Sequence, residues 1–303
     1  MKPGSIYREF IMNRWLYIMF LPPLIWFVIF VYWPMYGILI AFKNYNIVTG
    51  FANSPWVGIR YFEQFFSDPY FWRLLRNTLL INVYGLLWGF PVPILLALAF
   101  NELRNRKVKK VTQTISYLPY FISTVVVCGI VVKFLSPSTG VINAILQRLG
   151  FDSIYFLQKP EYFRTILISM GIWQSAGFNT IIYMATISGI NTELYESAIV
   201  DGANRRQQAW YITLPGMLPT IVIMLILNLG QLLMVGHERI ILLYNPMIYS
   251  TADVFNTYVY RRGLLEAEYS YAAAVSLFQC CLGFLLVYVS NRICRRLNET
   301  SLW

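Results

Sequence analysis

Six long apolar stretches dominate the chain, and they constrain its fold more than any other feature. Each is at least as long as the roughly 20 apolar residues that a helix needs to cross the hydrocarbon core of a membrane. Helices satisfy every backbone hydrogen bond within the segment, which lipid requires. The stretches occupy residues 15–42, 78–100, 113–135, 165–188, 216–236 and 270–291. They predict an all-α membrane protein with six transmembrane helices.

The composition excludes several classes of protein. Of the 303 residues, 57% are hydrophobic and only 13% are charged, whereas about a quarter of a soluble domain is charged. A soluble enzyme, a disordered chain and a nucleic-acid-binding domain are therefore excluded, although the formal net charge is +10. In a membrane protein, a basic excess is typical of loops that face the cytoplasm and its anionic lipids.

The distribution of Lys and Arg predicts the orientation. With the N-terminus inside the cell, the inner segments would be 1–14, 101–112, 189–215 and 292–303. They hold 13 basic residues in 65 positions, against 10 in 97 positions for the outer segments 43–77, 136–164 and 237–269. Because basic residues favour the cytoplasmic side, both termini are predicted to be cytoplasmic.

This topology divides the chain into four regions. A cytoplasmic N-terminus (1–14) precedes a first transmembrane helix and an aromatic-rich outer loop (15–77). A core of five helices (78–291) carries a long cytoplasmic loop at 189–215, and a cytoplasmic tail (292–303) follows. Nine aromatic residues lie between Phe51 and Trp72. Aromatic side chains favour the membrane–water interface, so an interfacial helix is expected there.

The chain lacks several kinds of catalytic chemistry. No Lys follows a Gly, which excludes a Walker A loop, and no G-x-S-x-G sequence occurs. The one histidine, His237, cannot supply a metal cluster. None of the six predicted spans contains Asp or Glu, which disfavours a proton- or sodium-coupled carrier. We therefore predict no catalytic residue and no metal site.

Neutral polar and aromatic side chains do occur inside the spans. Burying an amide in lipid is costly, so these residues should face neighbouring helices or a wet cavity. They could serve as interhelical hydrogen bonds, or they could line a pathway for a hydroxyl-rich solute, with amides pairing to hydroxyls and aromatic rings stacking on sugars. Spacings of six and four predict that the first three share roughly one helical stripe. The candidates are Trp173, Asn179, Tyr183, Asn228 and Gln231.

The loop at 189–215 has strong local signals. Asn191 or Thr192 can cap a short helix, and Gly202 can end it by taking a backbone conformation that other residues resist. Asp201 is expected to hold that turn by accepting backbone hydrogen bonds. A second short helix should begin near Ala203, and Pro215 should mark the entry to the fifth span. The loop is therefore predicted to be rigid.

The same loop resembles the EAA loop of bacterial ABC importer permeases. The family pattern is E-A-A-x-x-D-G-A, followed about nine residues later by I-x-L-P. Only Ser197, which stands for an alanine, departs from it, and Ser is small enough for the helix packing to survive. The residues that match the pattern, with this one departure, are Glu196, Ser197, Ala198, Asp201, Gly202, Ala203, Ile212, Leu214 and Pro215.

The resemblance extends over nearly the whole chain. Segments that are similar to the lipoprotein-B-like branch of polysaccharide and oligosaccharide permeases lie at 36–43, 54–58, 71–78, 258–265 and 300–303. This branch is in turn similar to the maltose-type carbohydrate permeases. The resemblance implies the type I ABC importer permease fold and a bacterial plasma-membrane location. It also implies half of a translocation pathway for oligosaccharides, coupled through the EAA loop.

The resemblance further implies the partners. These are a second permease subunit, two ATPase subunits inside and a substrate-binding lipoprotein outside, which the aromatic loop is hypothesised to contact. The chain needs no cofactor of its own, because ATP and Mg would be bound by the partner ATPase. A secondary carrier for a neutral polar solute is the alternative function, and a membrane-embedded enzyme lacks a catalytic cluster.

Overall fold

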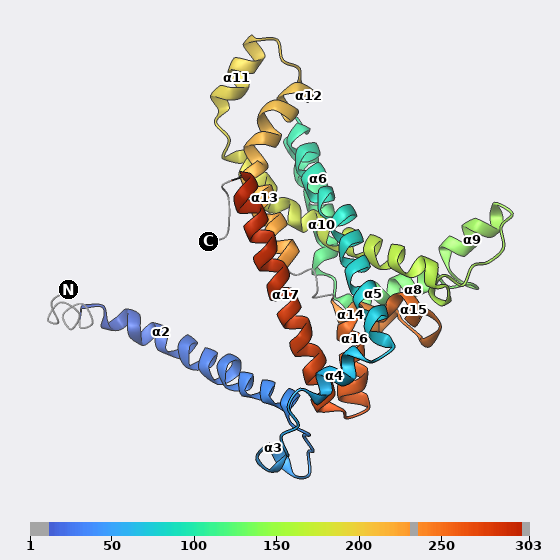
Figure 1. Cartoon of the computed structure of the whole chain (residues 1–303). Coiled ribbons are helices and arrows are strands. Elements are labelled where there is room, and N and C mark those ends of the chain that lie inside the picture. The colour runs from blue at the N-terminus through green and yellow to red at the C-terminus, as the bar shows by residue number, and fades with distance from the viewer. Residues whose placement is uncertain (1–11, 231–235, 299–303) are drawn as a thin grey trace.

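The computed structural model describes residues 12–230 and 236–298, and the regular elements in these residues are helices (Figure 1). Eight of them are eleven residues or longer. These are α2 (Arg14–Phe27), α5 (Tyr70–Tyr84), α6 (Pro91–Glu102), α7 (Arg106–Tyr117), α8 (Thr124–Phe134), α10 (Pro160–Ser188), α13 (Leu214–Gly230) and α17 (Tyr269–Asn298).

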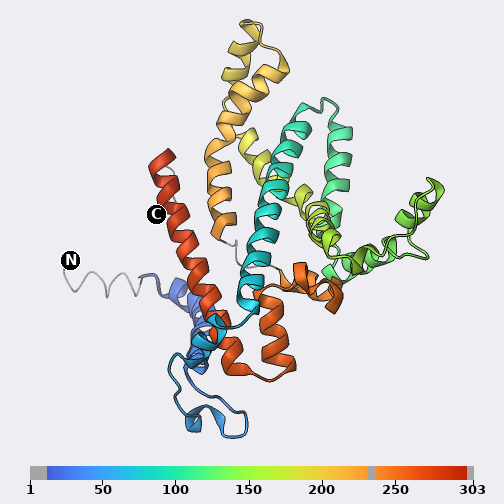
Figure 2. The same ribbon diagram turned by 45° about the vertical axis from the view of Figure 1, so that its right-hand side comes forward.

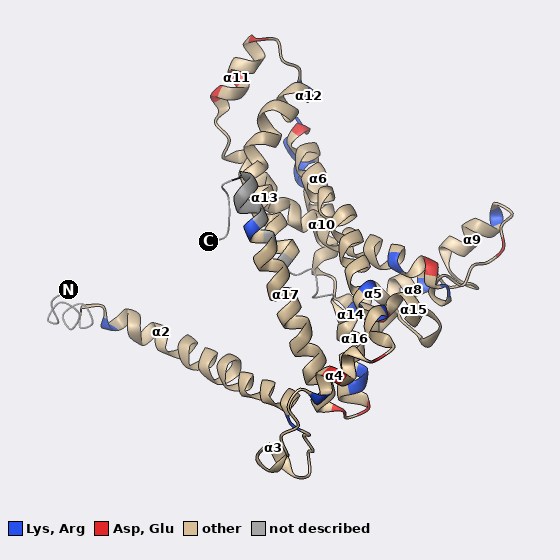
Figure 3. Ribbon diagram, in the orientation of Figure 1, with Lys and Arg blue, Asp and Glu red and all other residues tan. Residues whose placement is uncertain are grey.

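Shorter helices lie at the two ends of this bundle. They are α3 (Gly50–Asn53), α4 (Arg60–Phe66), α9 (Val141–Arg148), α11 (Thr192–Val200), α12 (Arg205–Gln208), α14 (His237–Leu243), α15 (Tyr249–Ala252) and α16 (Phe255–Val259). Figure 3 shows that the charged residues gather near the same two ends, while the long helices between them carry few. This distribution fits a bundle whose middle lies in lipid.

The apolar helices confirm part of the predicted topology. Four continuous helices are long and apolar enough to cross a membrane, and a fifth candidate is a bent pair. The predicted third span, 113–135, is divided between two helices, because the chain turns by 98° between Phe121 and Thr124. Pro119 lies one turn before the break, and a proline inside a helix removes a hydrogen bond and kinks it. The four continuous helices are Arg14–Phe42, Tyr70–Glu102, Arg205–Leu229 and Tyr269–Val289.

The predicted fourth span is α10, which is less apolar than the four continuous helices. At 29 residues it is long enough, but its sequence contains many polar side chains. It packs against α5, α6, α7 and α13, and nine of its residues are buried. A central helix is shielded from lipid by its neighbours, so it can carry polar groups that an outer helix cannot.

The first apolar helix, α2, contrasts with α10 in its exposure. No residue of α2 is buried, and Figure 1 shows it extending away from the bundle. Only its continuation, Trp33–Phe42, packs against α17. Apolar side chains this exposed need another apolar surface, either lipid or protein, to cover them.

Three of the long helices contain a widened, π-type turn that ends two residues before a proline. Proline has no N–H, and its ring clashes with the carbonyl four residues earlier. A turn with wider hydrogen-bond spacing accommodates that clash without breaking the helix. The turns and their prolines are Val28–Tyr32 with Pro34, Gly85–Gly89 with Pro91, and Ala209–Thr213 with Pro215.

The aromatic-rich loop forms a packed cluster as well as an exposed surface. Phe65 is fully buried, and Phe71 is nearly so. They pack against Phe255 and Tyr271, which lie far away in the sequence. The expectation of a purely interfacial helix is therefore incomplete. Part of the aromatic set is core, and the exposed part includes Trp56, Phe66 and Trp72.

Candidate functional site

A cavity of about 440 Å³ lies between α5, α6, α10 and α13. Its wall includes the widened turn at 85–89, which supplies two glycines. Its polar side chains are mostly neutral, and Arg239 is the one charged residue among the described residues that line it. The polar lining residues are Asn82, Ser175, Asn179, Tyr183, Asn228 and Arg239.

Three of the five predicted pathway residues border this cavity: Asn179, Tyr183 and Asn228. Trp173 does not, and it lines a separate, almost wholly apolar groove beside α8. Trp173 does not lie on the predicted common stripe. Six residues of helix rotate the side-chain direction by one full turn and about 240° more, so the side chains of Trp173 and Asn179 point about 120° apart around the helix axis. Gln231 lies outside the described residues.

The side-chain amides that line the cavity differ in whether they already form hydrogen bonds within the protein. Asn82 donates to the carbonyl oxygen of Thr78, and Asn228 donates to that of Met224, each at 2.7 Å within its own helix. Asn179 is exposed to the cavity, and its side chain forms no hydrogen bond with any described residue. Its amide can therefore donate to and accept from a ligand hydroxyl.

Gln174 connects the cavity to the broken helix. Its side chain is buried, and its Nε2 donates to the carbonyl oxygen of Ile122 at 3.0 Å. Its Oε1 accepts from Nη2 of Arg239 at 2.9 Å. Ile122 ends the segment before the 98° break, so this amide satisfies a carbonyl that a continuous helix would have paired. The hydrogen-bonding interpretation of the span amides holds for Gln174.

Gly177 fixes the crossing of α7 and α10. A Cβ atom at this position would overlap the carbonyl oxygen of Ser116 on α7, so only glycine allows the two backbones to lie this close. One residue further, Phe178 stacks on Tyr120 with ring centroids 3.9 Å apart. The sequence analysis missed Gly177, because a single glycine within an apolar run does not reveal its neighbour.

The loop at 191–215 is a helical hairpin that projects beyond the rest of the bundle (Figure 2). Asn191 caps α11, as predicted, by accepting from the backbone N–H of Glu193 at 3.0 Å. Gly202 ends α11 with a φ of +76°. The N–H of Gly202 donates to Ile199 O, and the N–H of Ala203 donates to Ala198 O at 2.8 Å. This pair of bonds is a Schellman turn, which confirms the prediction for Gly202.

Two details of the loop differ from the prediction. The side chain of Asp201 accepts no hydrogen bond from any described residue, because the backbone alone closes the turn. The second helix begins at Arg205 after an Asn204 cap, and it continues unbroken to Leu229. Pro215 therefore lies inside a continuous helix and does not mark its start.

Few contacts attach this hairpin to the bundle. Tyr195 on α11 forms a hydrogen bond at 2.9 Å with the hydroxyl of Thr213, in the turn of helix that joins α12 to α13. Arg205 forms an ion pair with Glu102 at the end of α6, at 3.3 Å and with both side chains about half exposed. Exposed apolar side chains cover much of the hairpin surface, and they are Leu194, Ile199, Val200, Trp210 and Tyr211.

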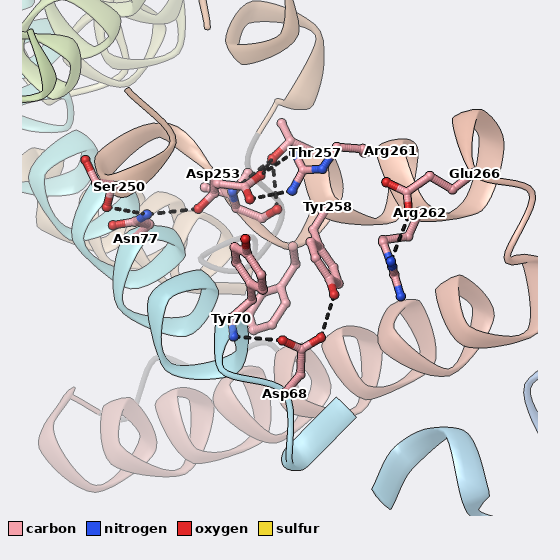
Figure 4. A network of polar contacts seen from close by, with 12 residues as sticks. Asp68, Tyr70, Asn77, Ser250, Asp253, Thr257, Tyr258, Arg261, Arg262 and Glu266 are labelled. Carbon is pink, nitrogen blue, oxygen red and sulfur yellow. Dashed lines mark hydrogen bonds and ion pairs between the residues drawn. The ribbon is translucent and has the colours of Figure 1, made fainter. Parts of the chain in front are cut away.

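The opposite end of the bundle contains a buried ion pair (Figure 4). Asp253 is fully buried and accepts from Nη2 of Arg261 at 2.7 Å and from the hydroxyl of Thr257 at 2.8 Å. Burial alone would lower the pKa of Arg261, but the contact with Asp253 outweighs it and raises that pKa. Asn77 on α5 donates to the carbonyl oxygens of Ser250 and Asp253 and so ties α5 to this network.

Asp68 extends the same network into the aromatic loop. It accepts from the hydroxyls of Tyr258 and Tyr271 at 2.6 and 2.8 Å, and from the N–H of Tyr70 at 2.8 Å. Partial burial acts to raise the pKa of Asp68, but these hydrogen bonds to the ionised form outweigh it and lower that pKa. We call the Asp253 and Asp68 contacts together the Asp253 network.

The fold, the cavity and the projecting hairpin define a transporter component, and the chain belongs to the family of binding-protein-dependent transport system inner membrane components, whose model matches residues 89–296. The chain is thus a multi-pass membrane protein and an ABC transporter permease component, and it is not itself an enzyme.

Several relatives are similar to the chain over nearly its full length. Protein LplB of Bacillus subtilis is 42% identical over 96% of this chain and 92% of its own length. The polygalacturonan/rhamnogalacturonan transport system permease protein YteP of the same organism is 41% identical over 100% of this chain and 94% of its own. A subunit of a bacterial ABC transporter involved in the import of the acidic polysaccharide alginate has a TM-score of 0.90 and 47% identity. That match covers 97% of this chain and 99% of the subunit.

Proposed function

We propose that the chain forms half of the translocation pathway of an ATP-driven importer for oligosaccharides. The observation that carries the proposal is a continuous helix, Arg205–Leu229. It starts at the turn of the projecting hairpin, and residues near its other end, Met224 and Asn228, line the cavity. An element that joins an exposed docking surface to a cavity wall is what ATP-driven transport by separate subunits requires.

The proposed topology has six spans, with α10 as the fourth and the bent α7–α8 pair as the third, and with both termini in the cytoplasm. The excess of Lys and Arg in the segments around 101–112 and 292–303 supports this orientation. The hairpin then faces the cytoplasm, where an ATPase can reach it, and the Asp253 network lies at the outer end.

The proposed partners are a second permease, two ATPases that bind ATP and Mg, and an extracellular substrate-binding lipoprotein. A related alginate ABC transporter, with a TM-score of 0.90 to this chain, has been solved in complex with a periplasmic protein bound to an alginate pentasaccharide. The exposed apolar side chains Leu194, Ile199 and Val200 offer the ATPase a packing surface. The EAA residues Glu196 to Pro215 would transmit its motion.

Uptake by the reconstituted complex tests this proposal. The chain is purified with its second permease and ATPases, placed in liposomes, and supplied with the binding protein and radiolabelled oligosaccharides. We expect uptake that requires ATP and is insensitive to ionophores. Uptake that ionophores abolish and ATP does not drive would favour a secondary carrier and contradict the proposal.

A matched pair of variants tests the cavity. Asn179→Leu removes an unoccupied amide from the cavity wall, whereas Trp173→Leu alters the apolar groove on another face of the same helix. We expect Asn179→Leu to lower uptake about tenfold, because each lost hydrogen bond to a buried ligand costs about 1–1.5 kcal/mol. Trp173→Leu should leave uptake within about twofold, and assembly of both variants should be unchanged. Equal losses would show that this cavity is not the pathway.

A further inference from the structure

Arg239 is the one arginine among the described residues that lines the cavity, and it forms no ion pair with any of them. Three other arginines, Arg205, Arg261 and Arg262, form ion pairs with carboxylates. Arg239 forms none with any described residue, and it donates a hydrogen bond to the neutral amide of Gln174. Its side chain is only partly exposed.

A cation without a paired carboxylate attracts anions. Water and neutral polar groups screen that attraction only in part where the cation is partly enclosed. The other polar residues that line the cavity, including Asn179 and Asn228, are neutral. They can solvate the charge only in part, so the cavity favours an anionic occupant.

The surroundings of Arg239 hold the guanidinium in one place. Nη2 donates to Oε1 of Gln174, whose own Nε2 is fixed on the carbonyl oxygen of Ile122. Nη1 lies against Gly171, where an added Cβ would be only 3.2 Å away. Glycine at 171 therefore leaves room for the guanidinium beside α10. The group is oriented by one hydrogen bond, and its remaining N–H groups are available to a ligand.

We propose that Arg239 binds a carboxylate of an acidic oligosaccharide, and that it selects uronic-acid substrates over neutral ones. The planar guanidinium matches a carboxylate with two parallel hydrogen bonds. Asn179 and Asn228 would bind hydroxyls of the same sugar chain. This inference rests on the proposed function, and it agrees with the acidic polysaccharides in the names of two similar proteins, a polygalacturonan permease and an alginate importer.

The test compares two substrates in the reconstituted complex. One is an unsubstituted trigalacturonate, and the other is the same trisaccharide with its carboxyl groups reduced to alcohols. Initial uptake is measured over a range of concentrations for wild type, Arg239→Gln and Arg239→Lys. Because the binding protein can also discriminate, the thermal stabilisation of the purified membrane complex by each trisaccharide is measured without it.

We expect Arg239→Gln to lower uptake of trigalacturonate about tenfold or more, as for the loss of a charge-assisted contact. Its uptake of the reduced trisaccharide should be unchanged, and the extra stabilisation by trigalacturonate should disappear. Arg239→Lys should prefer trigalacturonate over the reduced trisaccharide to a degree between that of wild type and that of Arg239→Gln. Arg106→Gln, which removes an exposed positive charge at the start of α7, is the control and should behave as wild type.

A second variant supplies a carboxylate from within. Gln174→Glu places an anion beside Arg239 but also removes the donor to the carbonyl oxygen of Ile122, so it is compared with Gln174→Met, which removes the same amide without adding a charge. Only Gln174→Glu should compete with the substrate carboxylate and so raise the trigalacturonate concentration needed for half-maximal uptake further than Gln174→Met does. Equal losses for both trisaccharides in Arg239→Gln, with normal assembly, would show a structural role and overturn the inference. If the wild type takes up the reduced trisaccharide but not trigalacturonate, the inference about Arg239 is overturned and the proposed importer function is left intact. If wild type takes up no oligosaccharide at all, both proposals fall.

Discussion

The two ends of this helix bundle are built in opposite ways. At one end, the Asp253 network buries a charged pair and joins α5, α16, α17 and the aromatic loop through hydrogen bonds. At the other end, the hairpin of α11 and α12 is well ordered internally, and besides its chain connections it is attached by the contacts of Tyr195 with Thr213 and of Arg205 with Glu102. The first arrangement fixes helices relative to one another.

The second arrangement gives a stiff unit that moves together with α13, because α12 and α13 belong to one continuous helix and few contacts hold the hairpin to other helices. The capped α11, the Schellman turn and the capped α12 satisfy the hairpin's own backbone groups, so its shape does not depend on the bundle. Exposed ion pairs contribute little, about 1 kcal/mol at most. A transporter whose ATPase pulls on one end needs this contrast, and each prediction below tests one side of it.

The largest effect is expected at Asp253. Asp253→Asn leaves Arg261 largely buried without a counterion, and breaking a buried pair on one side costs about 3–5 kcal/mol. We expect a lower thermal unfolding midpoint and less protein in the membrane. Glu266→Gln is the control, because it removes the partly exposed partner of Arg262 and should cost about 0.5 kcal/mol or less. Similar losses for both variants would show that the buried pair contributes no more than an exposed one, so this end would not be fixed by it.

Gly202→Val tests the stiffness of the hairpin. The open space around Gly202 would accept a side chain, but its φ of +76° would not. The strain of about 1–2 kcal/mol would depopulate the turn about five- to thirtyfold. We expect uptake and ATPase co-purification to fall in that proportion at normal membrane abundance. Gly202→Asn should be tolerated, because asparagine adopts this conformation readily. Normal uptake by the valine variant would show that the turn is not needed for coupling.

Tyr195→Phe tests how weakly the hairpin is attached. The variant loses the hydrogen bond to Thr213, whose hydroxyl still reaches the carbonyl oxygen of Gln208. We expect a loss of about 1 kcal/mol in unfolding free energy, measured in detergent. Tyr211→Phe, at a position that is 79% exposed, should cost nothing measurable. A loss comparable with that of Asp253→Asn would mean that the hairpin is locked to the bundle.

The smallest effect is a pH dependence confined to the Asp253 network. The folded-state pKa of Asp68 is held below its ordinary value of 3.8. Its hydrogen bonds therefore stabilise the fold fully above that value, and the stabilisation is lost as the pH falls through the lowered pKa. The unfolding midpoint of wild type should fall more steeply below pH 3.8 than that of Asp68→Asn, and the two should run parallel from pH 5 to 7. A divergence above pH 5 would contradict this assignment.

Local signals in the sequence were enough to predict the hairpin. The Asn191 cap and the Gly202 turn depend on a few adjacent residues, and both are confirmed. The role of Asp201 was predicted wrongly, because a side-chain acceptor is unnecessary where the backbone closes the turn itself. Pro119 could have revealed the break in the predicted third span. The number of spans, the orientation and the functional role of the predicted site residues stay predictions.

Features that depend on contacts between distant segments could not be predicted from local sequence patterns. Asp68 and Tyr258 are 190 residues apart, so no spacing rule relates them. Gly177 matters because of Ser116 on another helix, and Arg239 matters because of the cavity it borders. The polarity of α10 was read from the sequence, but its central position followed only from the packing of its neighbours.

The continuous helix Arg205–Leu229 has a mechanical consequence. Its 25 residues make a rod of about 37 Å at 1.5 Å per residue, so a tilt of about 10° at one end displaces the other by about 6 Å. Such a displacement is as large as a sugar ring. A lever of this kind needs no chain of side-chain rearrangements between the hairpin and the cavity. The size of the displacement depends on the point about which the helix tilts. That point is set by the helices that pack against α13, namely α10 and α17.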